Sequence, residues 1–223
     1  MSAIVFDLDG TLVDSAPDIR AIANTVLTEH DLPPLSMAQT RQFIGNGAGR
    51  FVARMMVASG LAPDAPGGAE TQARMLARFM ALYETVFHET APYPGAVAAL
   101  DTLAARGYRL GICTNKPAHA TRALLDHLGL LDRFDTVIAG DTLPVKKPDP
   151  APLDAAFAAL GGAALLYVGD SEVDAQTAQA AGLRFALFTE GYRKSPLAQV
   201  PHDLAFSHHD ALPALVMALR GAA

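Results

Sequence analysis

Residues Ala3-Ile4-Val5-Phe6 run directly into Asp7-Leu8-Asp9-Gly10-Thr11 near the start of the chain. An apolar run of this kind is typical of a strand buried on both faces of a parallel sheet. Two carboxylates crowded at a strand end repel each other unless a cation or a shared proton lies between them. Oxygen ligands suit a hard cation, and Mg²⁺ is the usual one where phosphate is handled. Taken alone, the pattern also fits an acidic turn after a buried strand.

Composition narrows the class of protein. A chain of 223 residues, 51% of them hydrophobic, can bury a large core in one or two domains. The formal net charge of −6 and the lack of a basic run argue against nucleic-acid and anionic-membrane partners. Neither a signal peptide nor an apolar run of membrane-spanning length is visible, so we expect a cytoplasmic protein. The single cysteine, Cys113, excludes an internal disulfide and is expected to be buried and inert.

Strand-like and helix-like patterns alternate through the second half of the chain. The apolar runs that follow the first one are Tyr108–Cys113, Thr136–Ala139, Ala164–Val168, Arg184–Phe188 and Asp203–Phe206. The helical patterns between and before them are Gly95–Ala105, Ala118–Leu128, Pro150–Leu160 and Val173–Ala181. Such alternation predicts an α/β fold with a doubly wound parallel sheet.

A helical insert separates the first strand from the second. Its amphipathic patterns are Ile19–Glu29, Met37–Ile44, Phe51–Ala58 and Ala69–Phe87. This interval is too long for one crossover connection, so we expect residues 16–88 to form a helical cap over a core of residues 1–15 and 89–223. Met55, Met56 and the stripe Phe79, Tyr83 and Phe87 are predicted to be the core of that cap. Both connections fall beside the acidic turn, where a lid would hinge.

Polar residues follow several of the predicted strands. Thr114 and Asn115 come directly after one strand, Lys147 precedes Pro148 in a later loop, and Asp170 and Asp174 follow another strand. Ligands of open α/β sheets bind outside the carboxyl ends of the strands. Carboxylates for a metal, with a lysine and a hydroxyl for phosphate oxygens, would therefore gather at one edge. Lys146, next to Lys147, is expected at the surface.

These motifs resemble those of the haloacid dehalogenase-like (HAD) superfamily. D-x-D-x-T at 7–11, the threonine at 114, the lysine before proline at 147 and G-D-S-x-x-D at 169–174 occur in the family's order. The resemblance implies a Rossmann-like core with an inserted α-helical cap. Two short strings, Phe43–Ala48 and Thr114–Pro117, are most similar to bacterial phosphoglycolate phosphatases.

The resemblance also implies a role for each matching residue. Asp7 is expected to be the nucleophile that forms an aspartyl-phosphate, Asp9 the general acid and base, and Lys147 the cation that offsets phosphate charge. Mg²⁺ is expected on the Asp7 carboxylate, the Asp9 main-chain carbonyl and Asp170, and Asp174 is expected to act through water or as a support for the ligands. Residues expected to bind phosphate or the rest of the substrate are Thr11, Thr114, Asn115, Gly45, Asn46 and Gly47.

The cap string leaves two interpretations open. Gly45 to Gly49 could be a loop that contacts substrate, or only a turn between helices. Arg50, directly after it, could meet a substrate carboxylate, although a surface helix arginine is the more ordinary interpretation. His208 and His209 are expected in a loop before the last helix and make a poor metal site without carboxylate or thiol partners.

The resulting hypothesis is a Mg²⁺-dependent phosphomonoester hydrolase for a small phosphorylated metabolite, with 2-phosphoglycolate as the best single substrate. A β-phosphoglucomutase-like sugar phosphomutase is the nearest alternative, because it uses the same chemistry, and a nucleotidase or pyrophosphatase stays open. A non-catalytic receiver-like phosphoacceptor module is more remote, because such modules lack the second aspartate and the insert. We expect a monomer or a homodimer.

Overall fold

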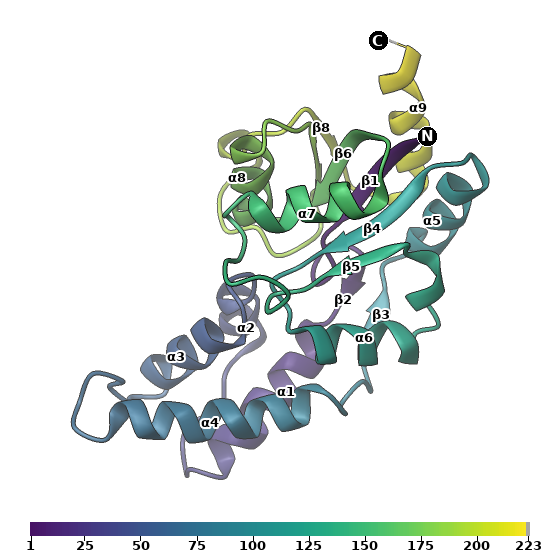
Figure 1. The fold of residues 1–223 in the computed structure, drawn as a ribbon. Helices are drawn as coiled ribbons and strands as arrows, with labels where there is room; N and C mark the ends of the chain where they lie inside the picture. The colour runs from purple at the N-terminus through teal and green to yellow at the C-terminus, as the bar shows by residue number, and fades with distance from the viewer. Residues whose placement is uncertain (222–223) are drawn as a thin grey trace.

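The fold is built on a six-stranded parallel sheet with the strand order β5-β4-β1-β6-β7-β8 (Figure 1). The computed structural model describes residues 1–221. The strands are β1 (Ser2–Phe6), β4 (Arg109–Cys113), β5 (Thr136–Ile138), β6 (Ala163–Gly169), β7 (Phe185–Phe188) and β8 (Leu204–Phe206). The predicted α/β class is confirmed, and only the ends of the expected strands shift.

Helices cover both faces of the sheet. Because successive strand residues point to opposite faces, Ile4 and Phe6 lie in one core cluster and Ala3 and Val5 in another. The first cluster is closed by α5 (Ala96–Ala105), α6 (Ala118–His127) and α9 (Leu212–Gly221). The second is closed by α7 (Ala151–Leu160) and α8 (Glu172–Ala180). This is the doubly wound arrangement, in which buried strands carry apolar residues on both sides.

Four of the five helices between β1 and β4 pack together around a further region of buried hydrophobic side chains. They are α1 (Ala16–Thr28), α2 (Met37–Phe43), α3 (Ala48–Ala58) and α4 (Gly68–Tyr83). Met55 and Met56 are buried in this cluster with Phe79 and Tyr83, as predicted. Figure 1 shows the helices as a layer beside the carboxyl ends of the strands.

The prediction for Phe87 was wrong. Helix α4 ends at Tyr83, and Phe87 packs against the sheet cluster, with its ring centroid 5.4 Å from that of His127. The helix cannot continue because the next segment is held by the buried Asp18 of α1. That carboxylate accepts hydrogen bonds from the main-chain N–H groups of His88, Glu89 and Thr90.

A two-stranded antiparallel ribbon marks where the chain leaves the sheet and returns. β2 (Val13–Asp14) pairs with β3 (Ala91–Pro92). The carboxylate of Asp18 ties the two passages together just beyond the ribbon, because it also accepts from the Thr90 hydroxyl at 2.6 Å. The connections to the four helices are therefore short, paired and adjacent to the Asp7–Thr11 turn.

Short helices precede β5 at Leu131–Arg133 and follow β7 and β8 at Leu197–Gln199 and His209–Ala211. The expectation of a plain loop at His209 was wrong. Its side chain is fully buried, and its Nε2 lies 2.8 Å from the carbonyl oxygen of Thr11. Aromatic rings of Tyr93, Phe188 and Phe206 surround it.

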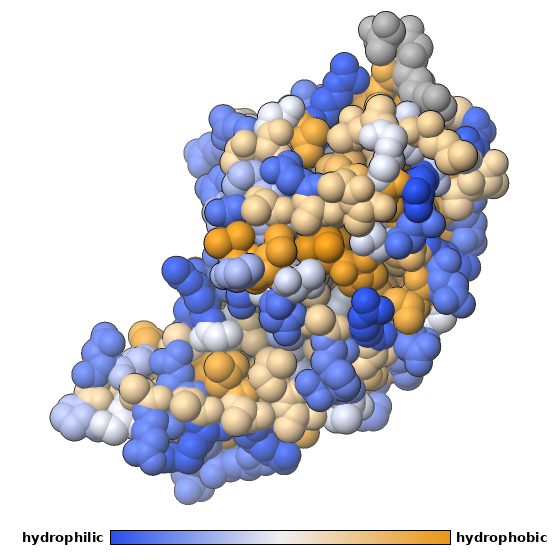
Figure 2. Space-filling model, in the orientation of Figure 1, coloured by the Kyte–Doolittle hydropathy of each residue, from blue (hydrophilic) through white to orange (hydrophobic). Residues whose placement is uncertain are grey.

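On the visible face, hydrophilic residues lie mainly around the edge, and an apolar band runs along α7 and the edge strand β5 (Figure 2). The residues of β5 are half-buried, and Val145 in the following loop is 40% exposed. Within residues 1–221, no helix combines the length and apolarity needed to cross a membrane.

Candidate active site

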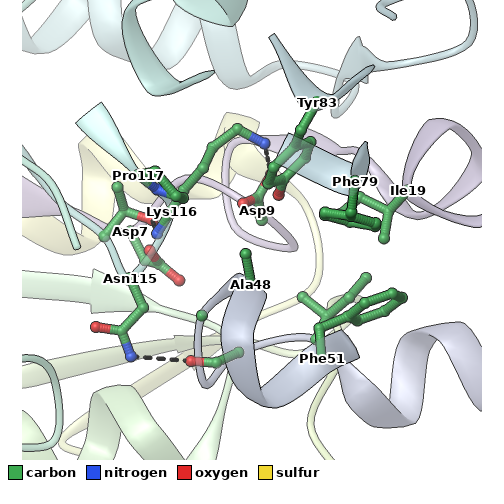
Figure 3. A pocket seen from close by; sticks show the side chains of 14 residues that line it. Asp7, Asp9, Ile19, Ala48, Phe51, Phe79, Tyr83, Asn115, Lys116 and Pro117 are labelled. Carbon is green, nitrogen blue, oxygen red and sulfur yellow. Dashed lines mark hydrogen bonds and ion pairs between the residues drawn. The ribbon is translucent and has the colours of Figure 1, made fainter. Parts of the chain in front are cut away.

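A cavity of about 450 Å³, including its open mouth, lies between the carboxyl ends of the strands and the four inserted helices (Figure 3). Its sheet side includes Asp7, Asp9 and Thr114, and its helical side includes Phe51 and Tyr83. The remaining lining residues are Ile19, Ile44, Gly45, Gly47, Ala48, Phe79, Asn115, Lys116 and Pro117.

The floor of the cavity is a buried charge cluster. The ammonium of Lys147 lies 3.0 Å from Asp7 Oδ1 and 2.6 Å from Asp174 Oδ1. It also donates to the Tyr167 hydroxyl at 2.8 Å, and that hydroxyl lies 2.7 Å from Asp174 Oδ1. Burial would lower the pKa of Lys147, but the two carboxylates outweigh it and raise the pKa. Lys147 is therefore a permanent cation against the nucleophile candidate.

The surroundings of the Asp7 carboxylate suit a bound cation. Burial raises the pKa of Asp7 to about 7, against the opposing effect of Lys147. Its Oδ1 is buried and accepts no well-directed hydrogen bond, although it forms an ion pair with Lys147. A buried carboxylate oxygen whose partner is an ion pair without a directed hydrogen bond has capacity for a further ligand.

Asp170 lies directly after β6 and close to Asp7. Its carboxylate accepts from the Thr11 hydroxyl at 2.9 Å and from the main-chain N–H of Tyr192. Burial, together with Asp174 and Asp7, raises its pKa well above the ordinary value. Thr11 thus orients the Asp170 carboxylate, and its expected contact with substrate stays a prediction. Gly10, at φ +86°, lets the Asp170 carboxylate lie close to the turn, because a Cβ at this position would lie 2.5 Å from that carboxylate.

The three carboxylates fit a hard cation. Ligand atoms of Asp7, Asp170 and Asp174 all lie within 4.8 Å of one another, and all three residues are buried. All the donor atoms are oxygens, which suit Mg²⁺. Asp7 Oδ1 forms no directed hydrogen bond, and the pKa of Asp170 is raised, so a positive ion between these carboxylates would stabilise them.

Asp174 differs from the other two carboxylates, because its oxygens already have partners. One faces Lys147 and Tyr167, and the other accepts from the Ser171 hydroxyl at 2.6 Å and from two main-chain N–H groups. Burial alone would raise its pKa, but Lys147 and these hydrogen bonds lower it. This arrangement suits a support for the lysine and the Asp170 loop more than a direct ligand.

Asp9 faces the cavity from a separate position. It accepts a 2.6 Å hydrogen bond from the Ser15 hydroxyl, and its Oδ1 lies 3.3 Å from Lys116 Nζ. The Lys116 ammonium also lies 3.8 Å from the centroid of the Tyr83 ring (Figure 3). Burial raises the pKa of Tyr83 and lowers that of Lys116. Asp7 and Asp9 thus have different partners, although they are two residues apart.

A loop between α2 and α3 closes the opposite wall. Asn115 donates its amide hydrogens to the carbonyls of Gly45 and Lys147, at 3.0 Å each. The expected contact of this amide with phosphate would require one of those bonds to be exchanged. Gly45 and Gly47 line the cavity, whereas Asn46 is half-buried and not among the lining residues.

Two further positively charged residues border the same loop. Lys194 Nζ donates to the carbonyl of Ile44 at 3.1 Å. Lys146 is exposed, as expected, but its ammonium approaches Gly47: a Cβ built on that glycine would lie 3.6 Å from it. Arg50 is exposed and lies outside the cavity lining of the described residues.

Sequence reasoning missed four residues of this site: Lys116, Tyr83, Tyr167 and Tyr192. Lys116 was quoted only as part of a resemblance, and Tyr83 was assigned to the cap core. Tyr192 joins the Asp170 loop to the connection at β2, since its hydroxyl accepts from the N–H groups of Ser15 and Ala16. Of these four residues, only Tyr167 could have been noticed in the sequence, because it is a tyrosine within an otherwise aliphatic run.

Comparison with known proteins supplies the family. The model of the haloacid dehalogenase-like hydrolases matches residues 4–188, which include every motif above. The chain belongs to this family. The residues of the charge cluster all lie within the matched range.

Relatives are similar over nearly the whole chain. A protein named phosphoglycolate phosphatase from Cereibacter sphaeroides (strain ATCC 17029) is 54% identical over 219 residues, 98% of this chain and 99% of the relative. One with the same name from Rhodobacter capsulatus is 44% identical, covering 96% of both chains. The crystal structure of a predicted phosphoglycolate phosphatase from Haemophilus somnus 129PT superposes with a TM-score of 0.87 at 30% identity, covering 96% of both chains.

Proposed function

We propose that this protein is a Mg²⁺-dependent phosphatase that hydrolyses 2-phosphoglycolate to glycolate and phosphate. A relative of that name is 54% identical over 98% of this chain. The observation that carries the proposal is the buried contact between Asp7 and Lys147, 3.0 Å long, beside a cavity that also holds Asp9.

The first chemical step is assigned to Asp7. A carboxylate oxygen of Asp7 attacks phosphorus, and the bond between phosphorus and the ester oxygen breaks. Lys147 holds the carboxylate and offsets the repulsion between it and the incoming phosphate. Tyr167 and Asp174 fix the ammonium of Lys147, so it is already oriented before the substrate binds.

Asp9 is assigned the proton transfers. It gives a proton to the leaving alkoxide, which has a high pKa, and then takes one from the water that attacks the aspartyl-phosphate. That second attack releases phosphate and restores Asp7. Ser15 and Lys116 hold the Asp9 carboxylate at one end of the cavity. The two aspartates thereby divide the nucleophilic and proton-transfer roles.

Mg²⁺ would be held by the Asp7 carboxylate, the Asp9 main-chain carbonyl and Asp170, and when bound it supplies charge neutralisation for the phosphoryl group. Thr11 and the Tyr192 N–H orient Asp170, and Asp174 supports Lys147. The Thr114 hydroxyl is assigned to phosphate oxygens.

Residues 16–88 are proposed to act as a cap on a core of residues 1–15 and 89–223. The bonds from Asn115 and Lys194 to the loop at 44–45 would hold it closed, and the ribbon of β2 and β3 would be the hinge. Closure excludes water and strengthens the charge interactions inside. We propose the cytoplasm as the location and a small phosphorylated metabolite as the partner.

The test is a phosphate-release assay over a panel of small phosphate esters, with Mg²⁺ and with excess chelator. We expect 2-phosphoglycolate to have the highest kcat/KM, and activity only with the metal. Asp7→Asn is expected to lower kcat by roughly 10³-fold or more. The matched control is Asp154→Asn, on the exposed side of α7, which keeps wild-type activity. Highest activity on a sugar phosphate or a nucleotide would refute the proposed substrate.

A further inference from the structure

We propose that Lys116 forms a carboxylate subsite, which selects phosphate esters that carry a carboxylate one carbon from the ester oxygen. This inference rests on the proposed function and extends it to the part of the substrate that is not phosphate. It concerns a residue to which neither the motifs nor the proposed mechanism assigns substrate binding.

Lys116 is built into the wall of the cavity. Its side chain is 1% exposed, and it lines the same cavity as Asp7 and Asp9. Its main chain is fixed on both sides, because its N–H donates to Thr114 Oγ and its carbonyl accepts from Gly140 at 2.8 Å. A buried lysine held in this way is costly without anionic partners, and that cost favours a functional explanation.

The Lys116 ammonium has hydrogen-bond donors left for an anion. It forms one ion pair, with Asp9 at 3.3 Å, and in the described part of the chain no other carboxylate pairs with it. Its second neighbour is the ring of Tyr83, at 3.8 Å from the centroid. A ring face is a weak partner compared with a carboxylate, and an ammonium has three donors. Lys147, in contrast, faces two carboxylates and a hydroxyl.

The position relative to Asp9 sets the length of the ligand. Asp9 delivers its proton to the ester oxygen, so that oxygen lies next to the Asp9 carboxylate. Lys116 is in direct contact with the same carboxylate. With bonds of about 1.5 Å, a carboxylate one methylene away from the ester oxygen extends roughly 3 Å further. A 2-phosphoglycolate molecule would reach both groups at once.

The rest of the cavity agrees with an acidic tail. The four lysines of the chain, at 116, 146, 147 and 194, all lie in or around this cavity, although the formal net charge of the protein is −6. The N-terminus of α3 also faces it through Gly47 and Ala48, and Gly47 provides no side-chain cap. Both features favour anions, and the aromatic side chains Phe51, Phe79 and Tyr83 leave little space for a bulky polar group.

The experiment compares 2-phosphoglycolate with ethyl phosphate, in which a methyl group replaces the carboxylate. The variants are Lys116→Met, Lys116→Arg and, as a control that also removes one positive charge, Arg122→Met at an exposed position of α6 outside the cavity lining. Lys116→Met should lower kcat/KM for 2-phosphoglycolate relative to ethyl phosphate by roughly 10- to 100-fold, mainly through KM. Lys116→Arg should restore part of the preference, and Arg122→Met should keep it.

Each outcome separates the subsite from the proposed substrate. If wild type prefers 2-phosphoglycolate and Lys116→Met retains that preference, the subsite is refuted and the proposed function stands. If wild type prefers 2-phospholactate, the proposed substrate fails, and loss of that preference in Lys116→Met supports the subsite. If wild type prefers 3-phosphoglycerate, whose carboxylate lies two carbons from the ester oxygen, the proposed substrate and the subsite are both refuted. If wild type prefers no carboxylated ester, both are refuted. An equal loss on all esters would place Lys116 with Asp9 as a positioning residue and overturn the subsite.

Discussion

His209 makes the stability of this protein depend on pH in a way that one substitution can isolate. The imidazole is fully buried below the Asp7–Thr11 turn, with Nε2 at 2.8 Å from the Thr11 carbonyl oxygen. Since a carbonyl only accepts, Nε2 carries the proton, and the buried Nδ1 has no hydrogen-bond partner. Protonation of Nδ1 would put a charge among Tyr93, Phe188 and Phe206, with Asp210 the nearby carboxylate. Burial therefore lowers the pKa of His209 to about 4.

The size and sign of the effect follow from the two pKa values. In the unfolded chain a histidine has a pKa of about 6.5, so above this pH both states are neutral and His209 has no effect on stability. As the pH falls below about 6.5, only the unfolded state takes up a proton. The free energy of unfolding therefore falls with the pH until the pH reaches the pKa of His209 in the folded state. Between pH 7 and pH 5 the loss from His209 amounts to about 2 kcal/mol, and the full loss below pH 4 is about 3 kcal/mol.

The assay is urea unfolding of wild type and His209→Gln at pH 7 and pH 5, followed by far-ultraviolet circular dichroism because the chain has no tryptophan. Glutamine keeps an N–H donor for the Thr11 carbonyl but does not titrate. Asp7, whose pKa is raised, has the opposite pH dependence, and it contributes equally to both proteins. We expect wild type to lose about 2 kcal/mol more than the variant between the two pH values. Parallel losses would mean that His209 is protonated in the folded state, and the reasoning would fail.

Three further predictions concern the metal, the lysine support and the loop contact. Addition of Mg²⁺ should raise Tm of wild type but not of Asp170→Asn, because Asp7 and Asp170 repel each other without a cation; equal shifts in a melting assay would count against this site. Tyr167→Phe should cost about 1–3 kcal/mol in urea unfolding and lower kcat more than it raises KM, since it frees the ammonium of Lys147; unchanged kcat would show that Asp174 suffices. Lys194→Met should raise KM for all esters alike and leave phosphorylation of Asp7 intact, because it loosens only the bond to the Ile44 carbonyl; a loss confined to one ester would contradict this.

The strands could be predicted because their signal is local. Runs such as Ala3–Phe6 are apolar on both faces, and the structure buries them on both faces. The motif residues could be placed at one sheet edge for the same reason, since parallel strands share their direction. Helix ends were less predictable. The apolar spacing from Phe79 and Tyr83 to Phe87 continues the helical pattern, but Asp18 binds the main chain at 88–90, and that contact crosses about 70 residues of sequence.

Local sequence patterns could not predict which residues contact one another in the site. Thr11 was expected to meet substrate, yet its hydroxyl bonds to Asp170 far along the chain. Lys116 gives no sign of burial in sequence, because its cover, Tyr83, comes from an inserted helix. Lys147 could be chosen over Lys146 because of the following proline, and the structure buries the first and exposes the second.

Trapping of the covalent intermediate tests the central claim most directly. Asp9→Asn should accept a phosphoryl group from 2-phosphoglycolate and hydrolyse it slowly, because Asp7 is intact and the water lacks its base. Peptide mass spectrometry after an acid quench should then find the mass of one phosphoryl group on the peptide that contains Asp7, only when Mg²⁺ is present. Label on any other residue, or none on Asp9→Asn while wild type turns over, would contradict the assignment of Asp7 as nucleophile.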